Sequence, residues 1–178
     1  MPVFEFERPQ RFVAGTVGPP GQRTFFLQAR DASRLVSVSC EKEQLSVLAE
    51  RIDALLDEYA AAASGAAAGA QQADNDPLEA PIEEEFRVNT ISLGWDPQRQ
   101  AVLLEADREP DLEEGGEEAE ATPDEEFSVR VVLLPAQARA FARRTKALVA
   151  AGRPPCPFCG GPLDASGHVC PRANGYRR

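Results

Sequence analysis

Four residues near the C-terminal end of the 178-residue chain have the types and spacing of a metal site. Cys156 and Cys159 form a C-x2-C turn, and eight residues later His168 and Cys170 form H-x-C. Thiolate sulfur and imidazole nitrogen are ligands that Zn²⁺ prefers, and Cys3His is one of its structural ligand sets. In an extended strand, residues two apart face the same way, so His168 and Cys170 can complete a site begun by the turn. We therefore predict a Zn²⁺ site built from these four residues.

Four protein donors favour a structural zinc, because a catalytic zinc keeps one position for water. A catalytic site would require one ligand, most readily His168, to give way to water. An iron–sulfur cluster would use four cysteines, and the remaining cysteine, Cys40, lies far upstream in an alternating segment that predicts a core position. The segment around the motif holds few apolar residues, so we expect metal binding to supply its stability.

The sequence contains no second constellation that could carry catalysis. His168 is the only histidine, and neither a P-loop nor a G-x-S-x-G motif occurs. These observations favour a non-enzymatic binding or adaptor protein. The alternative is an enzyme that uses an open zinc site or a pocket on the body of the protein, for which Asn89 and Trp95 are candidate lining residues.

The chain that precedes the zinc motif is typical of an α+β body. Alternation of apolar and polar residues predicts strands, and a 3.6-residue period predicts two helices. Pro135 suits the first position of the second helix. The expected strands are 4–6, 11–17, 23–29, 34–40, 86–95, 101–106 and 127–134, and the expected helices are 41–63 and 135–151.

After the short strand at 4–6, these elements follow the order strand, strand, strand, helix twice, which indicates an internal repeat. The helices match at a spacing of 93 residues, with Gln44 aligned to Gln137 and Arg51 to Arg144. We interpret the pattern as two tandem βββα repeats that form an antiparallel sheet with both helices on one face. The alternative is that two amphipathic helices rich in Ala and Arg resemble each other by composition alone.

Composition divides the chain into a body and a small C-terminal module. The body is expected to span 1–151, with a linker of small residues at about 62–77 and a disordered acidic loop at 107–126. Residues 152–178 form the expected zinc-ribbon-like module.

Charge is distributed unevenly along the chain. The net charge is −10, yet the segment from Pro135 onward carries eight Lys or Arg against one acid, Asp164, a local net of +7. Such asymmetry indicates a partner or an internal docking. The partner would be a nucleic acid or an acidic protein surface, and the acidic body argues against nucleic acid. The predicted partner-binding residues are Arg139, Arg143, Lys146, Arg153, Arg172, Arg177 and Arg178. We also hypothesise that the acidic loop folds over the basic helix.

The N-terminal segment resembles no signal peptide, and no apolar run approaches the length of a membrane span, so we expect a cytoplasmic protein with reduced cysteines.

Three segments of the chain resemble a known family. They are FEFERPQRFVAGTVGPPGQRTFFLQAR, LEAPIEEEFRVNTISLGWD and AGRPPCPFCGGPLDASGHVCPRANGYRR. They look like an uncharacterised domain-of-unknown-function family of high-GC Gram-positive bacteria. The resemblance implies a cytoplasmic protein without an assigned activity, and it supplies no catalytic residues.

Overall fold

The computed structural model describes residues 3–60, 74–108, 127–152 and 155–161, together with Leu163, His168, Cys170 and Arg172. The elements are β1 (Val3–Glu7), β2 (Arg11–Val17), β3 (Thr24–Arg30), β4 (Leu35–Cys40), α1 (Lys42–Leu55), the π-helical turn η1 (Leu56–Ala60), β5 (Glu84–Asp96), β6 (Ala101–Arg108), β7 (Ser128–Leu133) and α2 (Pro135–Ala150). No helix in these ranges is long and apolar enough to cross a membrane.

The strands form one seven-stranded sheet in the order β1-β7-β6-β5-β4-β3-β2. Pairing is antiparallel within β2-β3-β4 and within β5-β6-β7. The β4–β5 and β1–β7 pairs are parallel, so the prediction of an antiparallel sheet is wrong at these two junctions. The physical reason at β4–β5 is the crossover connection that contains α1. This connection brings the chain back level with the first residues of β4, so β5 runs in the same direction as β4.

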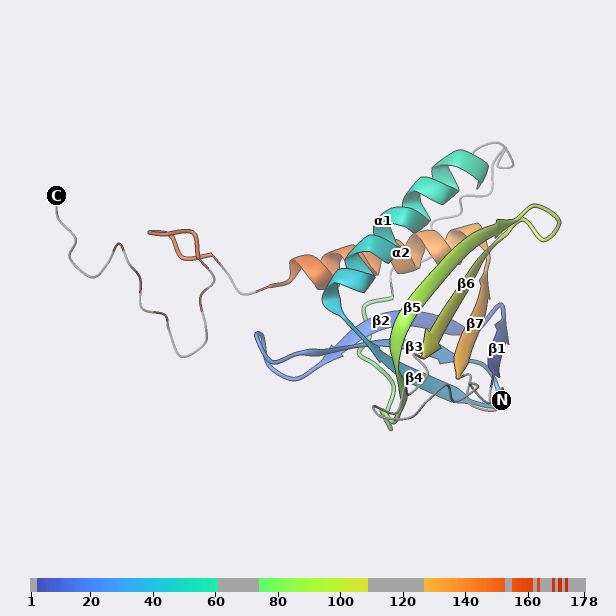
Figure 1. Cartoon of the computed structure of the whole chain (residues 1–178), viewed down its shortest axis with the longest axis horizontal. Helices are drawn as coiled ribbons and strands as arrows, with labels where there is room; N and C mark the ends of the chain where they lie inside the picture. The colour runs from blue at the N-terminus through green and yellow to red at the C-terminus, as the bar shows by residue number, and fades with distance from the viewer. Residues whose placement is uncertain are drawn as a thin grey trace, which may run out of the picture.

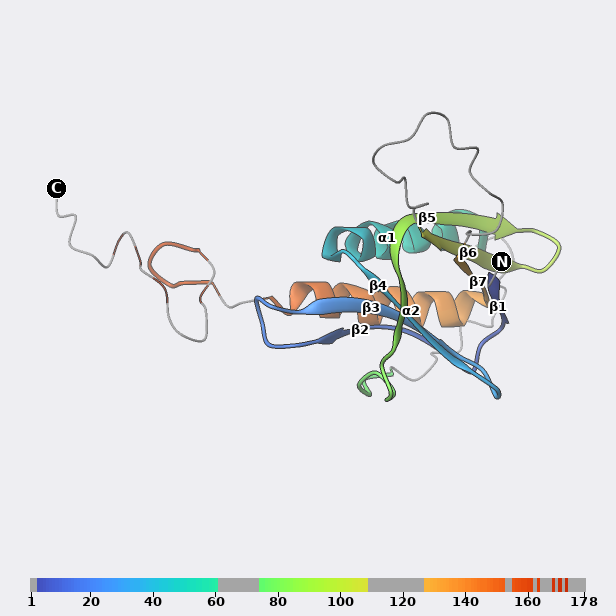
Figure 2. The same cartoon turned by 60° about the horizontal axis from the view of Figure 1, so that its bottom comes forward.

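The main core lies between the sheet and the two helices, which pack side by side on the same side of it (Figures 1 and 2). Alternate residues of the strands point into this core, as a period of two requires. Phe12 of β2 stacks on Phe141 of α2 at 4.7 Å between ring centroids. Cys40 is 6 % exposed in the same core, which confirms its predicted position.

Residues 74–83 form a segment that we call the strap, which runs from the edge of the sheet at β2 to the start of β5. Arg11 of β2 binds Asp74 through two hydrogen bonds of 2.6 and 2.9 Å. Arg144 of α2 binds the carbonyls of Asp74 and Asp76 at 2.5 and 2.6 Å. The end of the predicted linker, 74–77, is therefore held by two arginines.

The strap also packs on β2 and β3. The side-chain amide of Gln28 donates to the carbonyl of Glu79 and accepts from its N–H, at 3.0 and 2.8 Å. Leu78 lies over Gly15, where an added Cβ would meet Leu78 Cγ at 2.4 Å. The absence of a side chain at Gly15 is thus what allows the close approach of the strap.

Arginine side chains bind carbonyls on both outermost strands of the sheet. Arg144 donates to the carbonyl of Ala14 on β2 at 2.9 Å, and Arg34 donates to the carbonyl of Glu5 on β1. Unpaired edge strands favour pairing with other chains, and these contacts occupy one backbone acceptor on each edge.

Candidate metal centre

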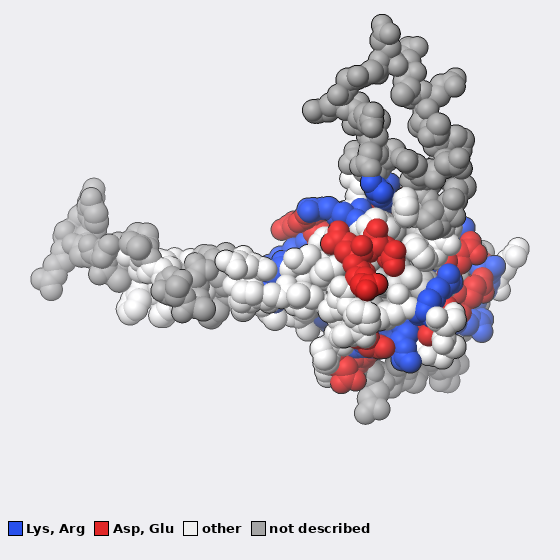
Figure 3. All heavy atoms as spheres, turned by 90° about the horizontal axis from the view of Figure 1, so that it is seen from below, with Lys and Arg blue, Asp and Glu red and all other residues white. Residues whose placement is uncertain are grey.

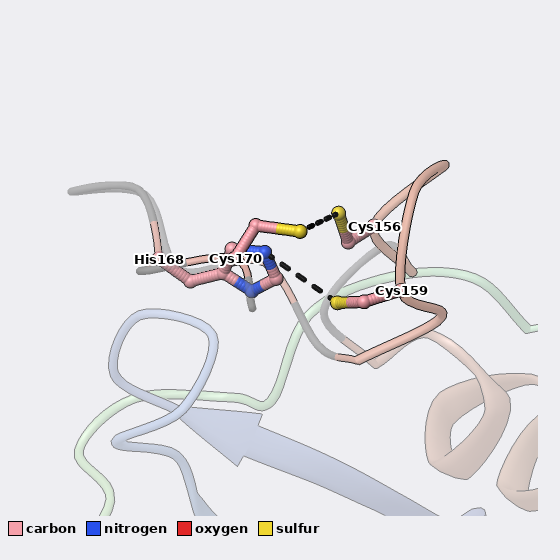
Figure 4. Close-up of side chains that lie close together, drawn as sticks. All are labelled: Cys156, Cys159, His168 and Cys170. Carbon is pink, nitrogen blue, oxygen red and sulfur yellow. Dashed lines mark hydrogen bonds between the residues drawn. The ribbon is translucent and has the colours of Figure 1, made fainter. Parts of the chain in front are cut away.

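The structure brings the four predicted metal ligands together beyond the C-terminal end of α2 (Figures 1 and 4). One ligand atom from each of Cys156, Cys159, His168 and Cys170 lies within 4.8 Å of the others. The sulfurs of Cys156 and Cys170 are 3.8 Å apart, and Cys159 Sγ lies 3.7 Å from His168 Nε2. The cluster could bind a metal ion through these four atoms.

The backbone of the C-x2-C turn places its two sulfurs. The carbonyl of Cys156 accepts from the N–H of Gly160 at 2.8 Å, and the N–H of Cys156 donates to the carbonyl of Gly161 at 2.7 Å. Gly160 has a φ of +73°, a conformation that costs glycine little and disfavours other residues. A tight turn stabilised in this way holds Cys156 and Cys159 on one side of the chain (Figure 4).

The thiols of the turn have opposite pKa shifts. Backbone N–H donation from Cys159, the largest effect, lowers the pKa of Cys156 to about 6. At Cys159 a hydrogen bond from the Gly161 N–H lowers the pKa, but burial and the neighbouring Cys170 and Cys156 outweigh it and raise the pKa. Thiolates at this distance repel one another, so ionisation of one thiol raises the pKa of its neighbours. A divalent cation would offset this repulsion and favour the thiolate form of every cysteine in the cluster.

Two predicted partner-binding residues form ion pairs between the helices. Arg139 binds Asp53 of α1 and Asp57 of η1, each at 2.7 Å, and Lys146 binds Asp53 at 2.5 Å. These acidic residues of α1 and η1 therefore contact basic residues of α2. Seen from below, acidic and basic side chains also lie beside one another on the body (Figure 3).

The remaining predicted partner-binding residues lie in different settings. Arg143 is exposed on α2, and Arg172 donates to the carbonyl of Phe158 at 3.3 Å. Arg153, Arg177 and Arg178 lie outside the described residues, as does the acidic loop from residue 109 onward.

Phe158 is a candidate functional residue that the sequence reasoning did not select. It lies between the two cysteines of the turn and is 65 % exposed, the largest value among the exposed large hydrophobic residues of the described chain. The signal available in the sequence was its position: a side chain between turn cysteines points away from the metal and has no core to enter.

Asn89 and Trp95 were the candidate lining residues of a pocket on the body. The ring of Trp95 on β5 stacks on Tyr59 of η1 at 6.1 Å between centroids, and Asn89 is exposed. Trp95 thus belongs to the packing between β5 and η1.

Comparison with known proteins identifies the family of the chain. Neither the curated proteins nor the solved structures include a match. A family model described as "Protein of unknown function (DUF3090)" matches residues 4–170, which include all four candidate metal ligands. The chain therefore belongs to the DUF3090 family of proteins of unknown function.

Proposed function

We propose that this protein is a non-enzymatic, zinc-containing adaptor that docks a protein partner through its C-terminal module. The observation that carries the proposal is the convergence of three sulfurs and one nitrogen within 4.8 Å. Four protein donors complete a tetrahedral shell, which is the arrangement of structural zinc sites. In this proposal the metal folds the module as a zinc ribbon and takes no part in a reaction.

Zinc fits this donor set better than the other common metals. Three soft thiolates disfavour Mg²⁺ and Ca²⁺, which take oxygen ligands. Cys156 and Cys170 are 4 % and 8 % exposed, so two of the sulfurs are already shielded from solvent. Binding free energy at such a site contributes directly to folding, about 10 kcal/mol or more in zinc-finger peptides.

The exposed ring of Phe158 is the proposed anchor for the partner. A metal-stabilised turn holds the ring outward, so little conformational entropy is lost when a partner buries it. Aromatic anchors and arginines are enriched at the centres of protein interfaces, and Arg172 binds the backbone of Phe158. The arginines at 153, 177 and 178 are proposed to extend this contact.

A protein partner is favoured over nucleic acid by the charges of the molecule. Arg139 and Lys146 of the basic helix are already paired with α1 carboxylates, and the net charge of −10 repels a polyanion. Of the five other predicted partner-binding residues, four lie in the module, and Arg143 lies on α2.

Comparative capture from native lysate tests this function. Full-length protein, Phe158→Ala and Val47→Ala are compared after nuclease treatment, because Val47 is an exposed apolar residue on α1 and serves as the matched control. The proposal predicts the same specific protein with wild type and Val47→Ala, and at least about tenfold less with Phe158→Ala at unchanged metal content. Equal capture by both variants, or a bound species that nuclease removes, would contradict it.

We further propose that the body arose by duplication of a βββα unit. In support, β2-β3-β4-α1 and β5-β6-β7-α2 have the same element order and the same antiparallel pairing within each half. The last strand of the first unit pairs in parallel with the first strand of the second, β4 with β5, and the last strand of the second unit pairs in parallel with β1, which directly precedes the first unit.

A further inference from the structure

A small pocket lies where the C-terminal end of α2 meets the β2–β3 hairpin and the start of α1. Its volume is ≈ 210 Å³, and its lining includes Gly21, Arg23, Phe25, Lys42 and Gly152. Figures 1 and 2 show these three elements converging at the end of the body from which the C-terminal module continues. The pocket is smaller than those that hold drug-sized ligands, so its ligand must be small.

The lining includes two cationic side chains and, among its described residues, no carboxylate. In a chain with 29 acidic and 19 basic residues, a pocket of this composition requires an explanation. Lys42 is one of two lysines in the sequence, and the other, Lys146, is paired with Asp53. Within the described part of the chain, Lys42 has neither an ion pair nor a hydrogen bond through its side chain.

Helix stability does not explain the presence of Lys42. It occupies the first turn of α1, where the helix dipole disfavours a cation. The neighbouring acid Glu41 is engaged with Arg87 on β5. A local arrangement that opposes stability is expected where a residue serves a function.

Arg23 is held in place before any ligand arrives. One of its terminal nitrogens donates to the carbonyl of Ala151 at 2.6 Å, and its guanidinium lies 5.6 Å from the ring centroid of Phe25. A guanidinium has five N–H donors, so several remain for a ligand. Its planar fork suits phosphate oxygens, and a fixed side chain loses little entropy on binding.

We infer that this pocket binds a small phosphate-bearing anion between Arg23 and Lys42. Two cations match the double charge of a phosphate group better than the single charge of a carboxylate. The inference is independent of the proposed adaptor role, since it depends on the pocket and not on the zinc ligands. The phosphate can belong to inorganic phosphate or to a small phosphorylated metabolite.

The two lysines provide a direct test. The full-length protein as purified is reductively methylated with ¹³C and titrated with inorganic phosphate, pyrophosphate or acetate at constant ionic strength. The inference predicts a saturable shift of the Lys42 methyl signal with the phosphates, no comparable shift at Lys146, and none with acetate. Preference for pyrophosphate over inorganic phosphate would indicate a phosphorylated metabolite as the source.

Charge variants make the test specific. Arg23→Gln is expected to weaken phosphate binding at least about tenfold, whereas Arg51→Gln, which removes the same charge from an exposed position on α1, leaves it unchanged. A second measurement uses unmethylated protein and follows the acetylation of each lysine by mass spectrometry. Phosphate is expected to slow the acetylation of Lys42 and not that of Lys146. Equal, non-saturating responses of both lysines would overturn the inference.

Discussion

Gln44 and Gln137 make matching hydrogen bonds in the two halves of the body. The side-chain oxygen of each accepts the backbone N–H at the start of its own helix, from Glu41 at 2.8 Å and from Leu134 at 3.2 Å. The side-chain nitrogen of each donates to a carbonyl in the other half: Gln44 to Asn89 on β5 at 2.8 Å, and Gln137 to Pro9 between β1 and β2 at 3.0 Å. The start of each helix is therefore bound to the first strands of the opposite half.

This relationship predicts similar effects for two distant substitutions. Gln44→Ala and Gln137→Ala each remove a capping acceptor and a cross-half donor, so each is expected to lower the free energy of unfolding by about 1–2 kcal/mol. Urea denaturation of each variant measures the change, with the exposed Gln98→Ala on the β5–β6 turn as control. A large effect at one glutamine and none at the other would contradict the equivalence of the two sites.

The contact between Gly15 and Leu78 predicts a coupled pair. Gly15→Ala places a Cβ against Leu78 and is expected to cost about 1–3 kcal/mol of stability through overpacking. Gly94→Ala is the matched control, because a Cβ there meets no atom within 4 Å. In the double variant Gly15→Ala, Leu78→Ala the cost should be less than the sum of the single changes, as measured by a double-mutant cycle. Additive costs would show that Leu78 does not exclude a side chain at position 15.

Arg144 is expected to contribute far more than the aligned Arg51 of the first helix. The Arg144 side chain is 14 % exposed and binds the carbonyls of Ala14, Asp74 and Asp76, whereas Arg51 is exposed. Arg144→Gln should lower the free energy of unfolding by about 2–4 kcal/mol. Arg144→Lys should restore only part of this stability, because an ammonium lacks the planar fork of a guanidinium. Arg51→Gln should change the free energy by no more than about 0.5 kcal/mol in the same denaturation assay. Similar losses for both variants would contradict this account of the strap.

The pKa of Asp53 predicts the acid sensitivity of the helix pair. Burial opposes ionisation, but Lys146 and Arg139 outweigh it, so the pKa of this carboxyl lies below its ordinary value of 3.8. Folding therefore favours the ionised form: the stabilisation is present above pH 3.8 and is lost as the pH falls through the lower folded-state pKa. Wild type should thus lose stability below about pH 4, and Asp53→Asn should lose less.

The measurement is the free energy of unfolding between pH 7 and pH 2.5, in chelator so that metal release does not contribute. At pH 7, Asp53→Asn should be less stable by up to about 1 kcal/mol. Glu50→Gln, an exposed change on the same helix, should follow the wild-type curve. Parallel curves for wild type and Asp53→Asn would show that this carboxyl is not linked to folding.

Local sequence patterns predicted most of the secondary structure. The alternation through Cys40 and the proline at the start of α2 predicted β4 and α2 to within one residue at each end, since each signal arises inside the element itself. The clustering of Cys156, Cys159, His168 and Cys170 was likewise predictable from a short motif. The predictions of strand pairing, of the linker and of exposed surfaces differ from the structure, because these features depend on contacts between segments that are distant in the chain.

The differences have specific physical causes. Helical periodicity identifies the apolar face of each helix, but it contains no information that Asp53 of one helix and Lys146 of the other would form an ion pair. Residues 74–77 were predicted to belong to a linker from their local composition. The groups that hold them, Arg11 and Arg144, lie far away in the chain, so local composition does not reveal these contacts. Parallel pairing of β1 with β7 depends in the same way on contacts between opposite ends of the body.

The most direct test of the central claim is the metal content of the full-length protein, measured by native mass spectrometry after purification without chelator. We predict one zinc ion per chain, retained in Cys40→Ala and lost or strongly weakened when Cys156, Cys159, His168 or Cys170 is replaced by alanine. A chain that binds no stoichiometric metal, or that keeps its zinc without His168, would contradict a closed four-ligand centre.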